Sequence, residues 1–276
     1  MNGDSFLGRM AASSRERVKV ARQQESEAAL SARALAQPAP PPLSLSEFSL
    51  IAELKLRSPA AGSLAIDDFD RNRQLQAYAS GGAAAISVLT EPAEFKGSLT
   101  HLREAATAVN AQGVPTMRKD FITDPYQVLE ARAEGAGGIL VIVTMLTNAD
   151  VEQLLACARE CGLFVLLEAF DVEDLERIAV LAAQDSSSSR LLCGVNCRNL
   201  KTLAVDFGRF SLLAAHLPTS LTSVAESGIE TNADVQAVAK LGFRAALVGS
   251  ALMRSDNPAN GAAALIAAGT EAVQCS

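Results

Sequence analysis

The sequence predicts an α/β protein, a closed (β/α)8 TIM barrel with an extra N-terminal helical segment. Eight short apolar runs alternate with helix-like patterns from residue 50 to residue 268. The runs are continuous rather than alternating, which is typical of parallel strands covered on both faces. The chain has 276 residues, 49% of them apolar, and a barrel of this kind takes about 250 residues. Eight units in this length favour a closed barrel over an open sheet.

The first 45 residues are predicted to form a helical extension and a linker that pack on the barrel. Residues 1–36 combine scattered arginines with a single apolar stripe, which is the pattern of a charged helix lying on a larger body. The proline-rich run from Pro38 to Pro42 breaks any helix and marks the linker. The barrel itself is expected over residues 46–276.

The barrel units follow in order, each an apolar run and then a helical pattern. The expected strands are residues 50–54, 83–89, 114–117, 138–143, 163–167, 191–195, 221–225 and 245–248. The expected helices are residues 71–80, 99–110, 125–134, 149–161, 172–183, 210–216, 232–241 and 258–268. Gly81-Gly82 ends the first of these helices, and Asp124-Pro125 starts the third with a cap and a first-turn proline. Loops are expected over residues 56–69 and 184–189.

The composition narrows the classes of function. A net charge of -7 argues against nonspecific nucleic-acid binding, which needs a basic field. No apolar run is long enough to span a bilayer, and the N-terminus lacks the apolar core of a signal peptide. We therefore expect a cytoplasmic protein with neither a nucleic-acid nor a membrane partner.

Cysteine and histidine offer little to a metal site or a nucleophilic triad. The five cysteines show no pairing pattern and no zinc-site spacing, and we interpret them as reduced thiols. The two histidines, His101 and His216, both fall in expected helices. If the protein is an enzyme, lysine and glutamate must carry its proton transfers.

Polar side chains follow many of the predicted strands, and Lys119 is central among them. Lys119 comes after the third strand and before the helix at Pro125, so it lies at the C-terminal face of the barrel, where barrel active sites are built. The same face is expected to carry Glu53, Lys55, Glu168, Asn196, Arg198 and Glu226. A carboxylate directly after a buried strand must meet a cation or a ligand, because burying it alone is costly. So many groups on one face predict a functional site rather than separate structural ion pairs.

Two glycine–serine pairs predict an anion site on that face. Ser227-Gly228 and Gly249-Ser250 follow the seventh and eighth strands, where barrels usually bind phosphate. Glycine lets backbone N–H groups approach an anion. The predicted partner is a phosphorylated small molecule.

Longer motifs surround these positions. They are residues 51–59, 87–91, 95–98, 118–122, 124–127, 194–196, 198–200, 225–229 and 247–250. Together these segments resemble indole-3-glycerol-phosphate synthase, the barrel family of tryptophan biosynthesis. The resemblance implies ring closure, decarboxylation and dehydration of 1-(2-carboxyphenylamino)-1-deoxyribulose 5-phosphate, a carboxy-lyase reaction that needs no cofactor and no metal.

The resemblance also implies roles for individual residues. Lys119 would be the general acid toward the ribulose carbonyl, and Lys55 would contact the substrate carboxylate and help in ring closure or dehydration. Glu168 would exchange protons with the anilino nitrogen or a later intermediate. Orienting roles would fall to Glu53, Asn196 and Glu226. The phosphate end would be held by Ser58, Ser227, Gly228, Gly249 and Ser250, with Arg198 also in contact with the substrate. Phe121 and Leu89 are candidate walls for its flat aryl ring.

Two other functions fit parts of the pattern. Phosphoribosylanthranilate isomerase resembles the chain at the phosphate loops but uses a cysteine early in its barrel, whereas here the first cysteine is Cys157. A non-catalytic phospholigand-binding barrel would not need Lys55, Lys119 and Glu168 together. For the assembly we expect a monomer or a weak homodimer.

Overall fold

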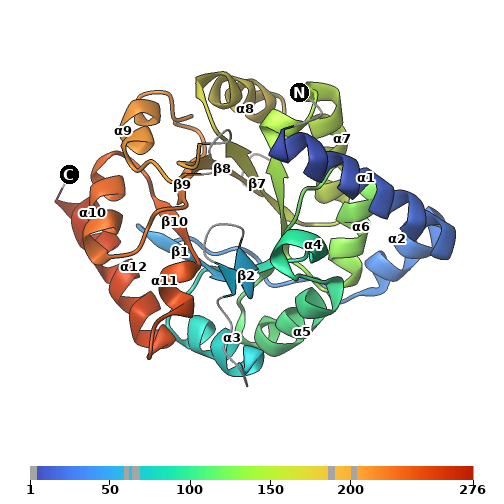
Figure 1. Ribbon diagram of the computed structural model, residues 1–276, viewed down its shortest axis with the longest axis horizontal. Coiled ribbons are helices and arrows are strands. Elements are labelled where there is room, and N and C mark those ends of the chain that lie inside the picture. The colour runs from blue at the N-terminus through green and yellow to red at the C-terminus, as the bar shows by residue number, and fades with distance from the viewer. Residues whose placement is uncertain (1–4, 59–61, 64–68, 186–189, 200–203, 276) are drawn as a thin grey trace.

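Eight parallel strands close on themselves into a barrel, and helices cover its outer wall (Figure 1). The computed structural model describes residues 5–58, 62–63, 69–185, 190–199 and 204–275. Around the ring the strands follow in the order β1, β4, β5, β6, β7, β8, β9 and β10, and β10 pairs with β1 to close it. The predicted (β/α)8 barrel is confirmed.

Each barrel strand lies close to its predicted position. The strands are β1 (Ser49–Leu54), β4 (Ala85–Leu89), β5 (Thr116–Lys119), β6 (Gly138–Ile142), β7 (Phe164–Ala169), β8 (Leu191–Asn196), β9 (Thr222–Glu226) and β10 (Ala245–Val248). Strand β5 ends at Lys119 rather than at Met117, because Arg118 and Lys119 still pair with Val88 and Leu89 of β4. Lys119 is therefore the last residue of its strand.

Helices follow the strands as the periodicity predicts. They are α3 (Arg71–Ser80), α5 (Leu99–Val109), α6 (Pro125–Ala133), α7 (Asn148–Glu160), α8 (Val172–Gln184), α9 (Gly208–Ala214), α10 (Asn232–Lys240) and α12 (Pro258–Gln274). Several short elements were not predicted: α4 (Pro92–Phe95), α11 (Ser250–Met253), and the 3-10 turns Asn110–Gln112 and Val143–Met145. The expected loop after β1 also contains a small antiparallel ribbon of β2 (Arg57–Ser58) and β3 (Gly62–Ser63).

The N-terminal segment is two helices, so the prediction of one continuous helix is wrong. Helix α1 (Phe6–Gln24) ends beside Glu25, and α2 (Glu27–Ala36) begins after Ser26. The Ser26 hydroxyl accepts a hydrogen bond from the N–H of Ala29, and this N-cap starts a new helix with a changed direction. Both helices lie across the side of the barrel near α6 and α7 (Figure 1).

The barrel wall is packed from both sides, and its carboxylates lie near one end. Every residue of β1, β4, β6, β7, β8 and β10 is buried, as the continuous apolar runs predict. The carboxylates among them, Glu53 and Glu168, come near the C-terminal ends of β1 and β7. Among the helices of the described ranges, none has the length and apolar character needed to cross a membrane.

Candidate active site

A cavity of about 440 Å³ opens at the C-terminal end of the barrel strands. It is lined by Phe6, Leu7, Glu53, Lys55, Leu89, Glu91, Phe95, Lys119, Asp120, Phe121, Leu140, Ile142, Glu168, Phe170, Asn196, Arg198, Val205, Glu226, Ser227, Gly228, Ile229, Glu230, Leu247, Gly249, Ser250 and Arg254. The set contains every residue predicted for the site except Ser58. Ser58 belongs to β2, but its side chain lies outside the described part of the structure, so its role stays a prediction.

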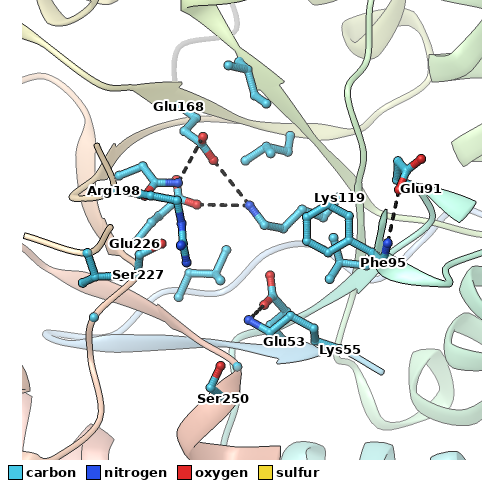
Figure 2. Close-up of a pocket in the computed structure, with 18 of the residues that line it drawn as sticks. Glu53, Lys55, Glu91, Phe95, Lys119, Glu168, Arg198, Glu226, Ser227 and Ser250 are labelled. Carbon is cyan, nitrogen blue, oxygen red and sulfur yellow. Dashed lines mark hydrogen bonds and ion pairs between the residues drawn. The ribbon is translucent and has the colours of Figure 1, made fainter. Parts of the chain in front are cut away.

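Lys119 lies at the centre of the cavity, between two carboxylates (Figure 2). Its Nζ is 3.4 Å from Glu168 Oε2 and 3.5 Å from Glu226 Oε2. Burial by itself would lower the pKa of Lys119, but the charges of Glu168, Glu226 and Glu53 outweigh that effect and raise the pKa. The side chain is therefore an ammonium ion that can donate a proton when a neighbouring oxygen gains negative charge.

A second ammonium group lies across the cavity on β1 and the residue after it. Lys55 Nζ is 2.8 Å from Glu53 Oε1, and the two side chains face Lys119 in Figure 2. Burial would raise the pKa of Glu53, but Lys55 and Lys119 outweigh it, so that the pKa lies below its ordinary value. Glu53 is thus ionised and holds Lys55 in place.

The carboxylate of Glu168 is oriented by the neighbouring strand. Asn196, the last residue of β8, donates from Nδ2 to Glu168 Oε1 over 3.3 Å. The Asn196 amide is itself fixed, because its Oδ1 accepts a hydrogen bond of 3.0 Å from the N–H of Arg198. One oxygen of Glu168 therefore faces an amide and the other faces Lys119.

Glu226, the last residue of β9, is the least stabilised carboxylate of the site. Neither of its oxygens accepts a hydrogen bond from another described residue, although Lys119 is near. Burial and the adjacent Glu168 raise the pKa of Glu226 well above its ordinary value. Glu226 therefore tends to hold a proton where Glu53 does not, so that the two carboxyl groups present different chemistry to a ligand.

The substitution Glu226→Gln is expected to raise the free energy of unfolding by an amount that grows with pH. In the unfolded chain Glu226 has an ordinary pKa of about 4.3, whereas its folded pKa is higher. Folding takes up a proton between these values, so across this window the native chain loses up to about 1.4 kcal/mol of stability per pH unit. Below the window the penalty is absent. Urea unfolding of the native protein and of Glu226→Gln over a pH series measures the difference in their free energies of unfolding. A stabilisation by Glu226→Gln that shrinks with rising pH would contradict the raised pKa of Glu226.

The loops after β9 and β10 supply backbone and hydroxyl groups to one side of the cavity. Ser227 and Gly228 both have left-handed backbone conformations, with φ of 68° and 70°. The buried thiol of Cys197 donates to the Ser227 carbonyl over 3.3 Å and holds this turn. Gly249 packs against Glu53, where a Cβ atom would lie 2.6 Å from Oε1. Both glycines thus allow a close approach of the backbone, as an anion site needs.

The opposite side of the cavity is apolar and aromatic. The Phe121 ring lies 5.9 Å from Phe6 in an edge-on arrangement and 6.3 Å from Phe95. In Figure 2 Phe95 lies across the cavity from Ser227. The carboxylate of Glu91 accepts hydrogen bonds from the first N–H groups of α4 and so fixes the short helix that carries Phe95. A ligand with a flat ring at one end and an anion at the other would match these two sides.

Sequence reasoning missed part of this lining. The lining also includes Phe6 and Leu7 from α1, Phe95 from α4 and Phe170 after β7. Glu230 and Arg254, which are exposed, line it too and pair over 3.2 Å. Phe95 stood in a motif and could have been found, since residues 95–98 follow a strand end. Phe6 and Leu7 could not, because they reach the cavity from a helix outside the repeating units.

Comparison with known proteins gives a consistent result over most of the chain. The family model described as indole-3-glycerol phosphate synthase matches residues 7–265. An indole-3-glycerol phosphate synthase of Nocardioides sp. is 47% identical over 210 residues, which cover 76% of each chain. That of Azospirillum brasilense is 42% identical over 220 residues, covering 80% of each chain.

Solved structures of other enzymes share the fold. A 3-hexulose-6-phosphate synthase from Salmonella typhimurium superposes with a TM-score of 0.61 at 14% identity, over 83% of this chain and 99% of that one. A thiamine phosphate pyrophosphorylase from Pyrococcus furiosus gives a TM-score of 0.55, also at 14% identity, over 82% of this chain and 98% of that one. At such identity these likenesses concern the barrel alone.

Proposed function

The chain belongs to the indole-3-glycerol phosphate synthase family, and we propose that Lys119, Lys55 and Glu168 carry the proton transfers of its reaction. The enzyme is a carboxy-lyase of tryptophan biosynthesis. It converts 1-(2-carboxyphenylamino)-1-deoxyribulose 5-phosphate into indole-3-glycerol phosphate, carbon dioxide and water. The observation that carries the residue roles is the position of Lys119, between Glu168 and Glu226 and facing Lys55 across one cavity.

Ring closure assigns the first role to Lys119. The aryl carbon that bears the carboxylate attacks the ribulose carbonyl, and the carbonyl oxygen must receive a proton as the new carbon–carbon bond forms. Lys119 is the buried ammonium at the centre of the cavity, and its neighbouring carboxylates keep it protonated until that step. Loss of carbon dioxide from the same aryl carbon then restores the aromatic ring.

Lys55 serves the substrate carboxylate and the steps around it. Its ammonium group lines the cavity and is held by Glu53, and it can pair with the substrate carboxylate before carbon dioxide leaves. Dehydration then needs an acid for the leaving hydroxyl and a base for the adjacent C–H proton. Lys55 can serve as the acid and Glu168 as the base. Asn196 keeps the Glu168 carboxylate oriented.

The remaining predicted residues hold the two ends of the substrate. Phe121, Leu89 and Phe95 form the wall for the aryl ring. Glu226 orients substrate hydroxyl groups, since neither of its oxygens accepts a hydrogen bond from a described residue. For the phosphate we assign Ser227, Gly228, Gly249 and Ser250, with Ser58 and Arg198 as further contacts.

Three wider expectations belong to the same proposal. Residues 1–45 act as an extension packed on a catalytic barrel of residues 46–276, which the contacts of α1 with α6 support. The cytoplasm is the proposed location, because that is where the other substrates of a biosynthetic pathway are made. The protein is proposed to act as a monomer or a weak homodimer, and sedimentation of the purified protein measures this.

A product assay tests the function directly. Purified protein is expected to form indole-3-glycerol phosphate and to release carbon dioxide from the named substrate, at the same rate with and without a chelator. Absence of product from folded protein would overturn the proposal, and loss of activity with the chelator would overturn its metal-free chemistry. Release of unreacted ligand after measurable binding would instead identify a binding protein.

A further inference from the structure

Asp120, which follows Lys119 in the chain, is a fully buried carboxylate held by an unusual number of donors. Its two oxygens accept hydrogen bonds from the Thr90 hydroxyl (2.7 Å), Arg118 Nη2 (3.1 Å) and the N–H of Phe121 (2.8 Å). Two more come from Arg17 of helix α1, at 3.0 and 2.7 Å. The Asp120 cluster, defined as Asp120, Arg17, Arg118 and Thr90, thus joins α1 to the ends of β4 and β5.

The cluster surrounds the backbone that carries the central lysine. Lys119 stands between Arg118 and Asp120, and its carbonyl accepts a hydrogen bond of 3.1 Å from the N–H of Thr90. The ion pairs of Lys119 itself are long, 3.4 and 3.5 Å, and leave Nζ free to follow its backbone. Phe121, on the other side of Asp120, forms part of the aromatic wall. A shift of Asp120 therefore moves the proposed acid and the ring wall together.

Within the cluster, Arg17 is the one member contributed from outside the barrel. Arg118 is only 2% exposed and is also bound to the Gln127 carbonyl and to Glu130, both at 2.8 Å, so the barrel holds it independently. Arg17 makes a two-point contact with the Asp120 carboxylate, which fixes the plane of that group as well as its charge. Without Arg17, the carboxylate keeps the donors from the barrel, Thr90, Arg118 and the N–H of Phe121, but loses both contacts that hold it from α1.

We infer that Arg17 is a positioning residue for Lys119 and Phe121, acting through the Asp120 carboxylate, an inference that rests on the acid role proposed for Lys119. It does not contact the cavity and is not a catalytic residue. Its role is to fix the peptide units on both sides of Asp120 from the N-terminal helix. Because a displacement of about 1 Å can cost about 10²-fold in rate, loss of Arg17 is expected to lower kcat about 10- to 100-fold with a smaller change in KM.

The same helix offers a matched control. Arg22 also makes a two-point contact with an aspartate of the loop after β5, Asp124, at 2.8 and 2.8 Å. It stacks over Tyr126 as well, with its guanidinium carbon 5.3 Å from the ring centre. Arg22 therefore docks α1 through the same kind of two-point contact, although its pair is more exposed, and it contacts neither neighbour of Lys119. A role in docking alone would change the thermal midpoint of both variants but would not lower kcat at Arg17 alone.

The experiment compares kcat, KM and thermal midpoint for Arg17→Met, Arg17→Lys, Arg22→Met and the native enzyme. We expect Arg17→Met to lose kcat as stated, Arg17→Lys to recover part of it, and Arg22→Met to keep kcat within about twofold. Equal kcat losses at both arginines, or an unchanged kcat in folded Arg17→Met, would overturn the inference. If Arg17→Met fails to fold, the comparison of Arg17→Lys with Arg22→Lys decides by the same criterion.

Chemical rescue gives a second readout that a purely structural role would not change. A separate cavity of about 310 Å³, lined by Arg17, Thr90 and Arg118, adjoins the cluster and provides room for a small cation. Millimolar guanidinium is expected to raise kcat of Arg17→Ala and to leave Arg22→Ala unaffected; no rescue, or equal rescue, counts against positioning.

The proposed function is tested separately, because it fails only if Lys119→Met retains turnover or the native enzyme has none.

Discussion

Lys119→Met is expected to reduce kcat by at least about 10³-fold, because the variant removes the proposed acid and no other group replaces it. Methionine has a similar length and an apolar end, so the cavity keeps its shape. Glu168 and Glu226 then lose their shared cation, and an uncompensated buried charge costs about 3–5 kcal/mol, which lowers the thermal midpoint as well. The measurement is product formation by folded protein, with circular dichroism to establish folding.

Lys119→Arg separates the two effects. It keeps a positive charge between Glu168 and Glu226 and so preserves stability, but its planar guanidinium is a very weak acid with a different shape. We expect it to fold and to remain nearly inactive. Lys19→Met, at an exposed lysine of α1, serves as the control and should match the native enzyme. A Lys119→Arg enzyme with more than a tenth of native kcat would exclude Lys119 as the acid.

Gly194→Ala is the second substitution with a large expected effect, although Gly194 does not line the cavity. Gly194 lies in β8 beside β9, and a Cβ atom there would be 2.0 Å from Glu226 Oε1 and 3.1 Å from Leu166 Cδ1. The Glu226 carboxylate must therefore leave its position beside Lys119. We expect kcat to fall about 10²-fold, since the charges that surround the proposed acid are displaced.

A double-mutant cycle tests this mechanism. In a Glu226→Ala background the carboxylate beside Gly194 is gone, so Gly194→Ala should have little further effect on kcat. Gly261→Ala in α12 is the control. A Cβ atom there would lie 3.2 Å from the Ser255 hydroxyl and 3.5 Å from Leu252 Cδ2, so this helical glycine should gain up to about 1 kcal/mol in stability with unchanged activity. Additive losses in the cycle would show that Gly194 acts on something other than Glu226.

The sequence predicts the barrel and the polar face well for a physical reason. The strands of a buried parallel sheet can be recognised in the sequence as continuous apolar runs. A charged residue directly after such a run, such as Glu168, is expected at the end of the strand, because burying it within the core would be costly. Because all parallel strands end at one face, residues far apart in the chain are brought together by topology alone. Lys119 and Glu226 meet in this way.

Other features depend on contacts that no periodicity encodes. The two-residue strands β2 and β3 and the four-residue helices α4 and α11 are too short to show a pattern. The break between α1 and α2 did leave a signal, because Ser26 followed by Glu27 is a good helix start, but the charged stripe on both sides hid it. Arg17 gives no sign of its partner, since Asp120 lies 103 residues away.

That distance along the chain has a consequence for biosynthesis. Helix α1 is synthesised before the barrel, and the groups that anchor it, Asp120 and Asp124, are made 103 and 102 residues after Arg17 and Arg22. At about 5–20 residues per second, its apolar stripe waits roughly 5–20 s for a docking surface. During that interval the nascent helix is a target for chaperones and for contact with other nascent chains, and the charged residues that alternate with the stripe help to keep it apart from them.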